Sequence, residues 1–150
     1  LTNLSDDFRL IVVCGREQSF LDQVNSLKEK YPSKILLAVG FAENMEELMV
    51  AADLIVGKAG PAVVFESLTI GRPLVLTNYI WGQEKGNRDF VVENGVGKYE
   101  PHTDRLAQTV SDFFANEAEY KKTMEKIGAL SFPIGTDEIL KKILKTKEAE

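Results

Sequence analysis

Short apolar runs alternate with longer amphipathic stretches through most of the chain. The runs are rich in β-branched residues and show little alternation, which is typical of parallel strands that helices cover on both faces. The stretches between them repeat apolar residues at helical spacing. We therefore expect strands over residues 9–14, 34–39, 53–56, 73–76 and 96–100. Helices are expected over residues 17–31, 43–52, 61–70, 83–93, 104–116, 117–130 and 136–147.

This alternation predicts an α/β fold, a three-layer, doubly wound, Rossmann-like parallel sheet of about five strands. The 150 residues, 44% of them hydrophobic, suit a single domain. A net charge of −5 makes nucleic acid an unexpected partner. With one cysteine, Cys14, and one histidine, His102, neither an internal disulfide nor a zinc site is expected, and a cytoplasmic, reducing location fits. No apolar run reaches the roughly 20 residues of a membrane span.

Each of the first four expected strands is followed by a loop of turn-forming residues. Because parallel strands run in one direction, these loops project from one edge of the sheet. In open α/β sheets that carboxyl edge is where ligands bind. The loops contain residues 15–16, 40–41, 57–61 and 77–84.

The loop over residues 57–61 has the composition of a phosphate site. We expect Gly60 at the N-cap of a helix and Pro61 at its first position. Proline has no amide hydrogen, so the free donors of the first turn are expected on Gly60, Ala62 and Val63, whose compact side chains let an anion approach. Lys58 adds a full positive charge beside the helix end. The alternative is a well-capped core helix that needs no ligand.

Glu66 extends this pattern toward a nucleotide. It lies three and four residues beyond Val63 and Ala62, hence on the same helical face, and its side chain tilts back toward the helix start. It is placed to accept both hydroxyls of a ribose whose phosphates occupy the helix end. The alternative is a solvated glutamate on an outer face.

The loop after the fourth strand contains polar groups suited to a sugar. Gln83 and Glu84 can together donate to and accept from vicinal hydroxyls. Trp81 is placed to stack on a sugar face or to cover apolar surface. The alternative for Gln83 and Glu84 is ordinary capping of the following helix.

Other residues point to structure. Cys14 ends a buried strand, has no histidine near it in sequence, and is expected in the core. No general acid/base pair or nucleophilic triad is evident, so no catalytic residue is assigned to this chain. In the last expected helix we predict an apolar stripe docked on the domain and solvated lysines, with an anionic membrane surface as the alternative. The stripe consists of Ile139, Leu140, Ile143 and Leu144, and the lysines are Lys141, Lys142, Lys145 and Lys147.

From about residue 10 to residue 112 the chain resembles the C-terminal, donor-binding half of GT-B glycosyltransferases of family 28. Within that family it looks most like monogalactosyldiacylglycerol synthases and processive diacylglycerol glucosyltransferases. The resemblance rests on the order and spacing of several short motifs. They are Val13-Cys14-Gly15-Arg16, Val39-Gly40-Phe41 with Asn44-Met45, Lys58-Ala59-Gly60-Pro61 with Glu66, Gly71-Arg72-Pro73, Gly82-Gln83-Glu84-Lys85-Gly86-Asn87 and Val92-Glu93-Asn94-Gly95.

The resemblance implies a UDP-sugar as substrate and no cofactor or metal. It places backbone near Phe41 and Ala42 on uracil, Glu66 on ribose, residues 60–63 on the diphosphate, and Gln83 and Glu84 on the sugar. Two positions depart from the family pattern: Val63 replaces a hydroxyl residue, and Trp81 replaces proline. The complete donor-binding set is Gly15, Arg16, Phe41, Ala42, Lys58, Ala59, Gly60, Pro61, Ala62, Val63, Glu66, Gln83, Glu84 and Asn87.

The resemblance also implies parts that this chain does not show. Relatives begin the domain with another strand and a glycine-rich loop, and they carry an acceptor-binding half with the catalytic base. The lost strand is central in the usual order 3-2-1-4-5-6. We expect residues 1–150 to form one nucleotide-sugar-binding domain, with strand order 2-1-3-4-5 if the chain is complete in itself. A second copy or a partner subunit would be other ways to fill the gap.

The expected function is donor binding in a hexosyltransferase that moves a sugar from a UDP-sugar to a lipid acceptor such as diacylglycerol. The isolated chain would bind the donor without turnover, and the whole enzyme would be peripheral to a membrane. One alternative is a flavodoxin-like binding or signalling module without transferase activity. Another is a sugar-nucleotide epimerase, which would need acid/base residues that are not evident.

Overall fold

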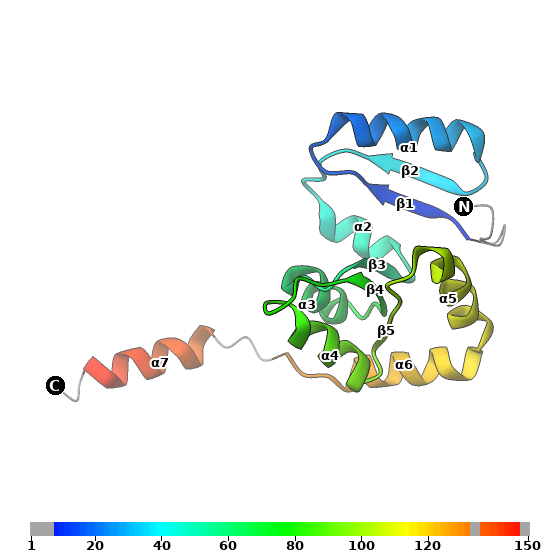
Figure 1. Ribbon diagram of the computed structural model, residues 1–150. Coiled ribbons are helices and arrows are strands. Elements are labelled where there is room, and N and C mark those ends of the chain that lie inside the picture. The colour runs from blue at the N-terminus through cyan, green and yellow to red at the C-terminus, as the bar shows by residue number, and fades with distance from the viewer. Residues whose placement is uncertain (1–7, 133–135, 148–150) are drawn as a thin grey trace.

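A computed structural model describes residues 8–132 and 136–147. Within them, strands and helices alternate as far as β5 and helices follow, which confirms the α/β class (Figure 1). The strands are β1 (Leu10–Val13), β2 (Ile35–Val39), β3 (Ile55–Lys58), β4 (Leu74–Asn78) and β5 (Gly97–Tyr99). The helices are α1 (Gln18–Lys30), α2 (Met45–Ala51), α3 (Pro61–Thr69), α4 (Lys85–Glu93), α5 (Thr103–Ala115), α6 (Glu117–Ala129) and α7 (Thr136–Lys147).

The strands form two parallel sheets. β1 pairs with β2, and β3, β4 and β5 form a second sheet in that order. Figure 1 shows β1, β2 and α1 on one side of the molecule and β3 to β5 with α3 to α6 on the other. The expected closure into one sheet of order 2-1-3-4-5 is therefore wrong for the described residues. β1 and β3 do not pair there, so each keeps one edge whose backbone groups no strand of the described chain satisfies.

Each sheet has its own hydrophobic core. The larger core surrounds β4, the central strand of its sheet, where Leu74, Val75 and Leu76 are fully buried. Val64 and Leu68 of α3 pack into the same cluster, so one face of α3 is fixed against the sheet. The smaller core joins Cys14, Val24 and Ile35, which confirms that Cys14 is a core residue.

Two element boundaries differ from the sequence-based expectation near the expected site. β3 extends to Lys58 because Gly57 and Lys58 continue the ladder with β4, with a register irregularity between them. α4 begins only at Lys85, because the amides of Gln83 and Glu84 instead donate to the carbonyl of Ile80 in a turn. Lys58 is thus part of a strand rather than a loop, and Glu84 is the N-cap residue of α4.

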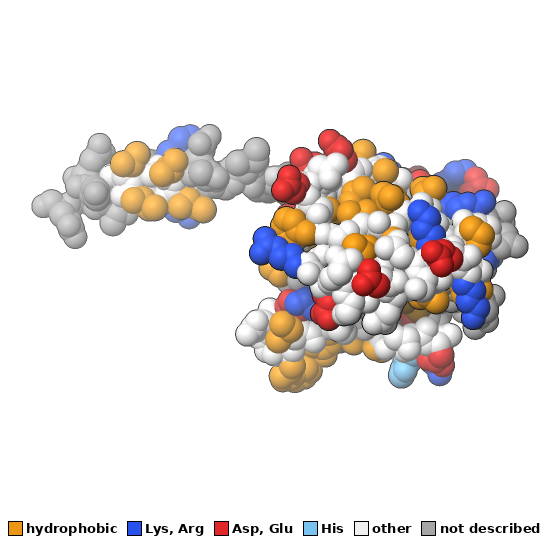
Figure 2. Space-filling view, turned by 90° about the horizontal axis from the view of Figure 1, so that it is seen from above, with side chains coloured by type: hydrophobic (Ala, Val, Ile, Leu, Met, Phe, Trp, Pro, Cys, Tyr) orange, Lys and Arg blue, Asp and Glu red, His pale blue; other side chains and the backbone are white. Residues whose placement is uncertain are grey.

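The last helix forms where it was expected, but its expected docking on the domain is wrong. Figures 1 and 2 show α7 extending away from the body of the molecule. Its four apolar side chains Ile139, Leu140, Ile143 and Leu144 are 51–60% exposed. Leu130 and Phe132, which follow α6, already cover the larger core where the chain leaves it. None of the described helices combines the length and hydrophobicity needed to cross a bilayer.

Two glycine substitutions test this packing in opposite directions. A Cβ at Gly97 would overlap the carbonyl oxygen of Leu74 and approach Val91 Cγ1 to 2.7 Å, both in the buried core. We expect Gly97→Ala to lower the free energy of unfolding by at least about 1–3 kcal/mol.

A Cβ at Gly128, inside α6, meets nothing within 4 Å. Gly128→Ala should therefore raise stability by roughly 0.5–1 kcal/mol. Urea unfolding measures both, and a neutral Gly97→Ala would contradict the described packing.

Candidate functional site

The junction between β3 and α3 presents the free amides that the sequence indicates. Gly60 is the N-cap in extended conformation, Pro61 follows it, and no side chain of the described part of the chain caps this end. The first amide that donates a hydrogen bond of the helical pattern is that of Val64, which donates to the Gly60 carbonyl at 3.0 Å. In the described structure the amides of Ala62 and Val63 therefore remain available. Ala62 is exposed and Val63 is half-buried, so the opening is accessible.

An ion pair stands beside this opening. Lys58 Nζ lies 2.8 Å from Glu84 Oε1, and the other carboxylate oxygen of Glu84 accepts a 2.8 Å hydrogen bond from the Ile80 amide. A Cβ at Gly60 would lie 3.7 Å from Glu84 Oε1 and 3.8 Å from Lys58 Cε, so the pair borders the N-cap directly. The hydrogen bond from Lys58, followed by that from the Ile80 amide, holds the pKa of Glu84 below its ordinary value, against the opposing effect of burial.

A second contact ties α4 to the same junction. Asn87 Nδ2 donates to the carbonyl oxygen of Ala59 at 2.9 Å. Glu84 and Asn87 are almost one helical turn apart, so both reach the junction from the start of α4. The structure therefore brings together Lys58, Ala59, Gly60, Glu84 and Asn87.

Glu66 lies on α3 one turn beyond Ala62, as expected from its spacing. Its side chain is exposed and makes no ion pair or hydrogen bond within the described residues. The neighbouring Phe65 packs against Phe90 and Phe132, with ring centroids 5.8 Å apart in each case. The Glu66 carboxylate is thus available to a ligand lying along the outer side of α3.

The predicted residues of the smaller sheet form a separate group. Arg16 stacks on Phe41, with its guanidinium carbon 4.4 Å from the ring centroid. The Gly15 amide donates to the carbonyl of Gly40 at 3.2 Å, and Gly15 adopts a φ of 69°, which favours glycine. These contacts join the loop after β1 to the loop after β2, next to Ala42. Phe41 remains 57% exposed.

The loop between β4 and α4 leaves the side chains of Ile80, Trp81 and Gln83 exposed. Gln83 is exposed and Trp81 is 75% exposed, with its ring 6.2 Å from that of Tyr79. Sequence reasoning missed Arg88, whose guanidinium carbon lies 4.6 Å from the Tyr79 ring centroid and 5.3 Å from that of Tyr99. These stacked groups support the base of the loop. No local sequence signal indicates them, because they come together only through the pairing of β4 with β5.

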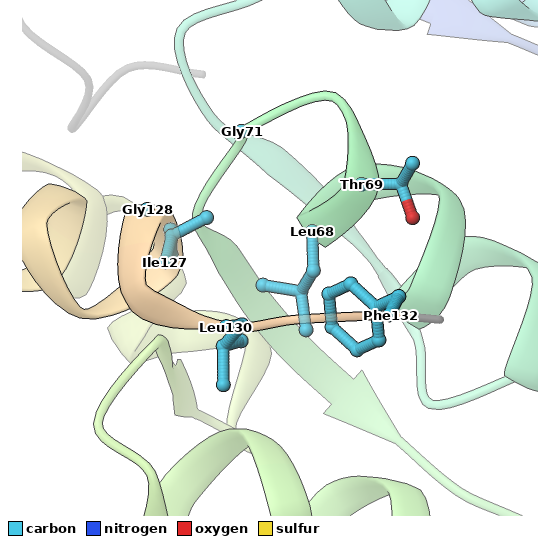
Figure 3. A pocket seen from close by; sticks show the side chains of 7 residues that line it. All are labelled: Leu68, Thr69, Gly71, Ile127, Gly128, Leu130 and Phe132. Atoms are coloured by element: carbon cyan, nitrogen blue, oxygen red, sulfur yellow. The ribbon is translucent and has the colours of Figure 1, made fainter. Parts of the chain in front are cut away.

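A pocket elsewhere in the molecule lacks the chemistry of a nucleotide site. It lies between the C-terminal end of α3 and the C-terminal end of α6, with Leu68 and Phe132 pointing toward one another (Figure 3). Its polar side chain, Thr69, already donates to the carbonyl of Phe65 at 2.7 Å. Because its described lining residues carry no charge, this pocket does not suit a diphosphate, whereas the β3–α3 junction does. Among the described residues, no cluster of three or more His, Cys, Asp or Glu side chains could hold a metal ion.

The α/β fold of the described residues is shared with other solved proteins. The structure is similar in fold to MurG from Acinetobacter baumannii, with a TM-score of 0.74 and 23% identity over 92% of this chain and 41% of that one. It is also similar in fold to the glycosyltransferase SsfS6 of Streptomyces sp. SF2575 in complex with thymidine diphosphate. That match has a TM-score of 0.56 and 13% identity, and covers 89% of this chain and 41% of the other.

The sequence assigns the family. The chain belongs to the glycosyltransferase family 28 C-terminal domain, whose family model matches residues 1–139. Monogalactosyldiacylglycerol synthase 3 of Arabidopsis thaliana is 40% identical over 90% of this chain and 29% of its own length. The monogalactosyldiacylglycerol synthase of Spinacia oleracea is 38% identical over 79% of this chain and 22% of its own length. The chain thus spans less than a third of these relatives, and the family match favours a transferase domain over a flavodoxin-like module or an epimerase.

The Lys58–Glu84 pair predicts a dependence of stability on pH. Because the pKa of Glu84 lies below the ordinary value of 4.5 in the folded protein, its contribution is present above about pH 4.5 and is lost as pH falls through the folded-state pKa. We expect Glu84→Gln to lower the melting temperature at pH 7, and this difference from wild type to shrink below about pH 4.5. Glu125→Gln, on the exposed side of α6, is the control for removing a carboxylate. A difference at pH 7 that persists unchanged at pH 3 would contradict a stabilising pair.

Proposed function

We propose that this domain binds the UDP-sugar donor of a glycosyltransferase reaction. The observation that carries the proposal is the β3–α3 junction, where the free amides of Ala62 and Val63 lie beside Lys58. A helix end of this kind attracts an anion by about 0.3–1 kcal/mol when exposed, and Lys58 adds a full charge. The diphosphate would occupy this opening, together with the amide of Gly60.

In this proposal the same groups assist the chemistry. An acceptor hydroxyl attacks the anomeric carbon of the sugar, and the bond to the diphosphate breaks. Negative charge then grows on the departing diphosphate. Amides and an ammonium fixed in advance at that position stabilise the charge without reorganisation. The domain would therefore contribute binding and leaving-group stabilisation, while the base that activates the acceptor lies outside this chain.

The other parts of the donor are proposed to lie on both sides of this opening. The exposed carboxylate of Glu66 would accept the ribose hydroxyls, one turn along α3 from the diphosphate. Backbone near Phe41 and Ala42 would pair with uracil, in the group that Gly15 and Arg16 stabilise. Gln83, in the exposed loop before α4, would contact the sugar. These roles are supported by exposure and position in the structure and by the match to the family.

The acceptor is proposed to be a lipid such as diacylglycerol, and the donor sugar a hexose. The relatives that resemble the chain are named for synthesis of monogalactosyldiacylglycerol. Because the chain spans under a third of those relatives, the acceptor-binding half and the catalytic base are proposed to lie in another part of the enzyme. We propose that a further strand there fills the position between β1 and β3. A lipid acceptor would bring the whole enzyme to a membrane surface, and this chain alone would bind donor without turnover.

Binding of UDP tests the proposal directly. At about 100 times Kd, UDP should stabilise the protein by about 2.7 kcal/mol, which corresponds to a melting shift of several degrees at this size. Glu66→Ala should lose most of the shift because the ribose hydroxyls lose their acceptor. Glu125→Ala, an exposed glutamate on α6, is the matched control and should retain it. Absence of any shift at millimolar UDP in the folded wild-type protein would overturn the donor site.

A further inference from the structure

Glu84 differs from the other residues predicted to touch the donor because its carboxylate is buried and already engaged. Only 8% of its side chain is exposed, and both oxygens have partners, Lys58 Nζ and the Ile80 amide, each at 2.8 Å. Each oxygen keeps a further lone pair, but the side chain is almost fully buried, so a sugar hydroxyl has little surface through which to reach it. Gln83, the preceding residue, is exposed and makes no side-chain hydrogen bond among the described residues. The two adjacent residues therefore have different surroundings.

Lys58 lies on the solvent side of the same pair. Its side chain is 46% exposed. An ammonium has three donors, and Glu84 occupies one of them, which leaves the others for a ligand at the opening of α3. A lysine side chain is long and flexible, so a free Lys58 would lose rotamer freedom whenever it bound an anion. Glu84 holds the ammonium next to Gly60 before a ligand binds, so binding causes a smaller loss of side-chain entropy.

We propose that Glu84 is a positioning residue, which fixes Lys58 for the diphosphate of the donor and does not contact the sugar. This inference rests on the proposed function and reassigns one residue within that site. Asn87 supports the same arrangement, since its hydrogen bond to the Ala59 carbonyl holds the backbone between Lys58 and Gly60. Recognition of the sugar then falls to Gln83 and its exposed neighbours in the loop.

The two roles for Glu84 give opposite results when UDP and a UDP-hexose are compared. A residue that touches the sugar affects only the UDP-hexose, whereas a residue that positions Lys58 affects both ligands through the diphosphate they share. Isothermal titration with UDP and with UDP-galactose measures both dissociation constants. We expect Glu84→Gln to weaken both ligands by the same factor, about tenfold, the effect of losing one charge-assisted hydrogen bond. Gln83→Ala should weaken UDP-galactose and leave UDP unchanged.

A double-mutant cycle separates positioning from a general structural role. If Glu84 acts through Lys58, Glu84→Gln should weaken UDP binding no further once Lys58→Met is present. A further loss in the Lys58→Met background would mean that Glu84 supports the site by another route and would overturn the inference. Melting curves at pH 7 confirm that each variant is folded.

The remaining outcomes are distinguishable. Weakening of UDP-galactose alone by Glu84→Gln would show contact with the sugar and overturn the inference while leaving the donor site intact. Unchanged UDP binding would show that Lys58 does not need the carboxylate to bind the diphosphate, and tighter binding would show that the carboxylate repels it. Either result would also overturn the inference. Failure of the wild-type protein to bind UDP would overturn the proposed function and this inference with it.

Discussion

The α3 helix begins in a way that leaves its own first-turn hydrogen-bond donors without partners among the described residues. Pro61 has no amide hydrogen, Gly60 has no side chain to act as a cap, and the amides of Ala62 and Val63 lie at an accessible opening. Such donors must be satisfied by water or by a ligand. Val64 and Leu68 pack into the larger core and so fix the orientation of the helix. The position of the opening at its N-terminus is therefore fixed as well. The proposed binding of a diphosphate depends on this constraint.

The groups around the opening are organised to keep it in place. β4 is fully buried through Leu74 to Leu76, and its pairing with β3 extends the strand to Lys58. From the other side, α4 contacts the junction through Glu84 and Asn87. The strands and α4 therefore hold in place a helix start whose backbone amides have no hydrogen-bond partner among the described residues. The nearby side chains of Glu66 and Gln83 are exposed and have no hydrogen-bond partner among the described residues.

The features set by local chemistry could be predicted from the sequence, and those set by tertiary contacts could not. Gly60 and Pro61 specify the helix start by themselves, and Glu66 follows from helical spacing. The pairing of Glu84 with Lys58 depends on the turn at Ile80 and on two elements far apart in the chain. The sequence alone therefore indicated for Glu84 only a sugar contact or capping of the following helix. The separation of β1 from β3 and the exposure of the apolar stripe of α7 likewise depend on tertiary packing between distant elements. Composition and periodicity do not contain that information.

The measurement that tests the central claim most directly is the change in backbone amide NMR shifts when UDP is added to the isotope-labelled protein. The account predicts that the largest changes fall on the amides of Gly60, Ala62 and Val63, and that they saturate together. The pocket at the other end of α3, around Leu68 and Gly128, should show little change. Saturable shifts that spare the first turn of α3 would contradict the claim that this helix opening binds the diphosphate.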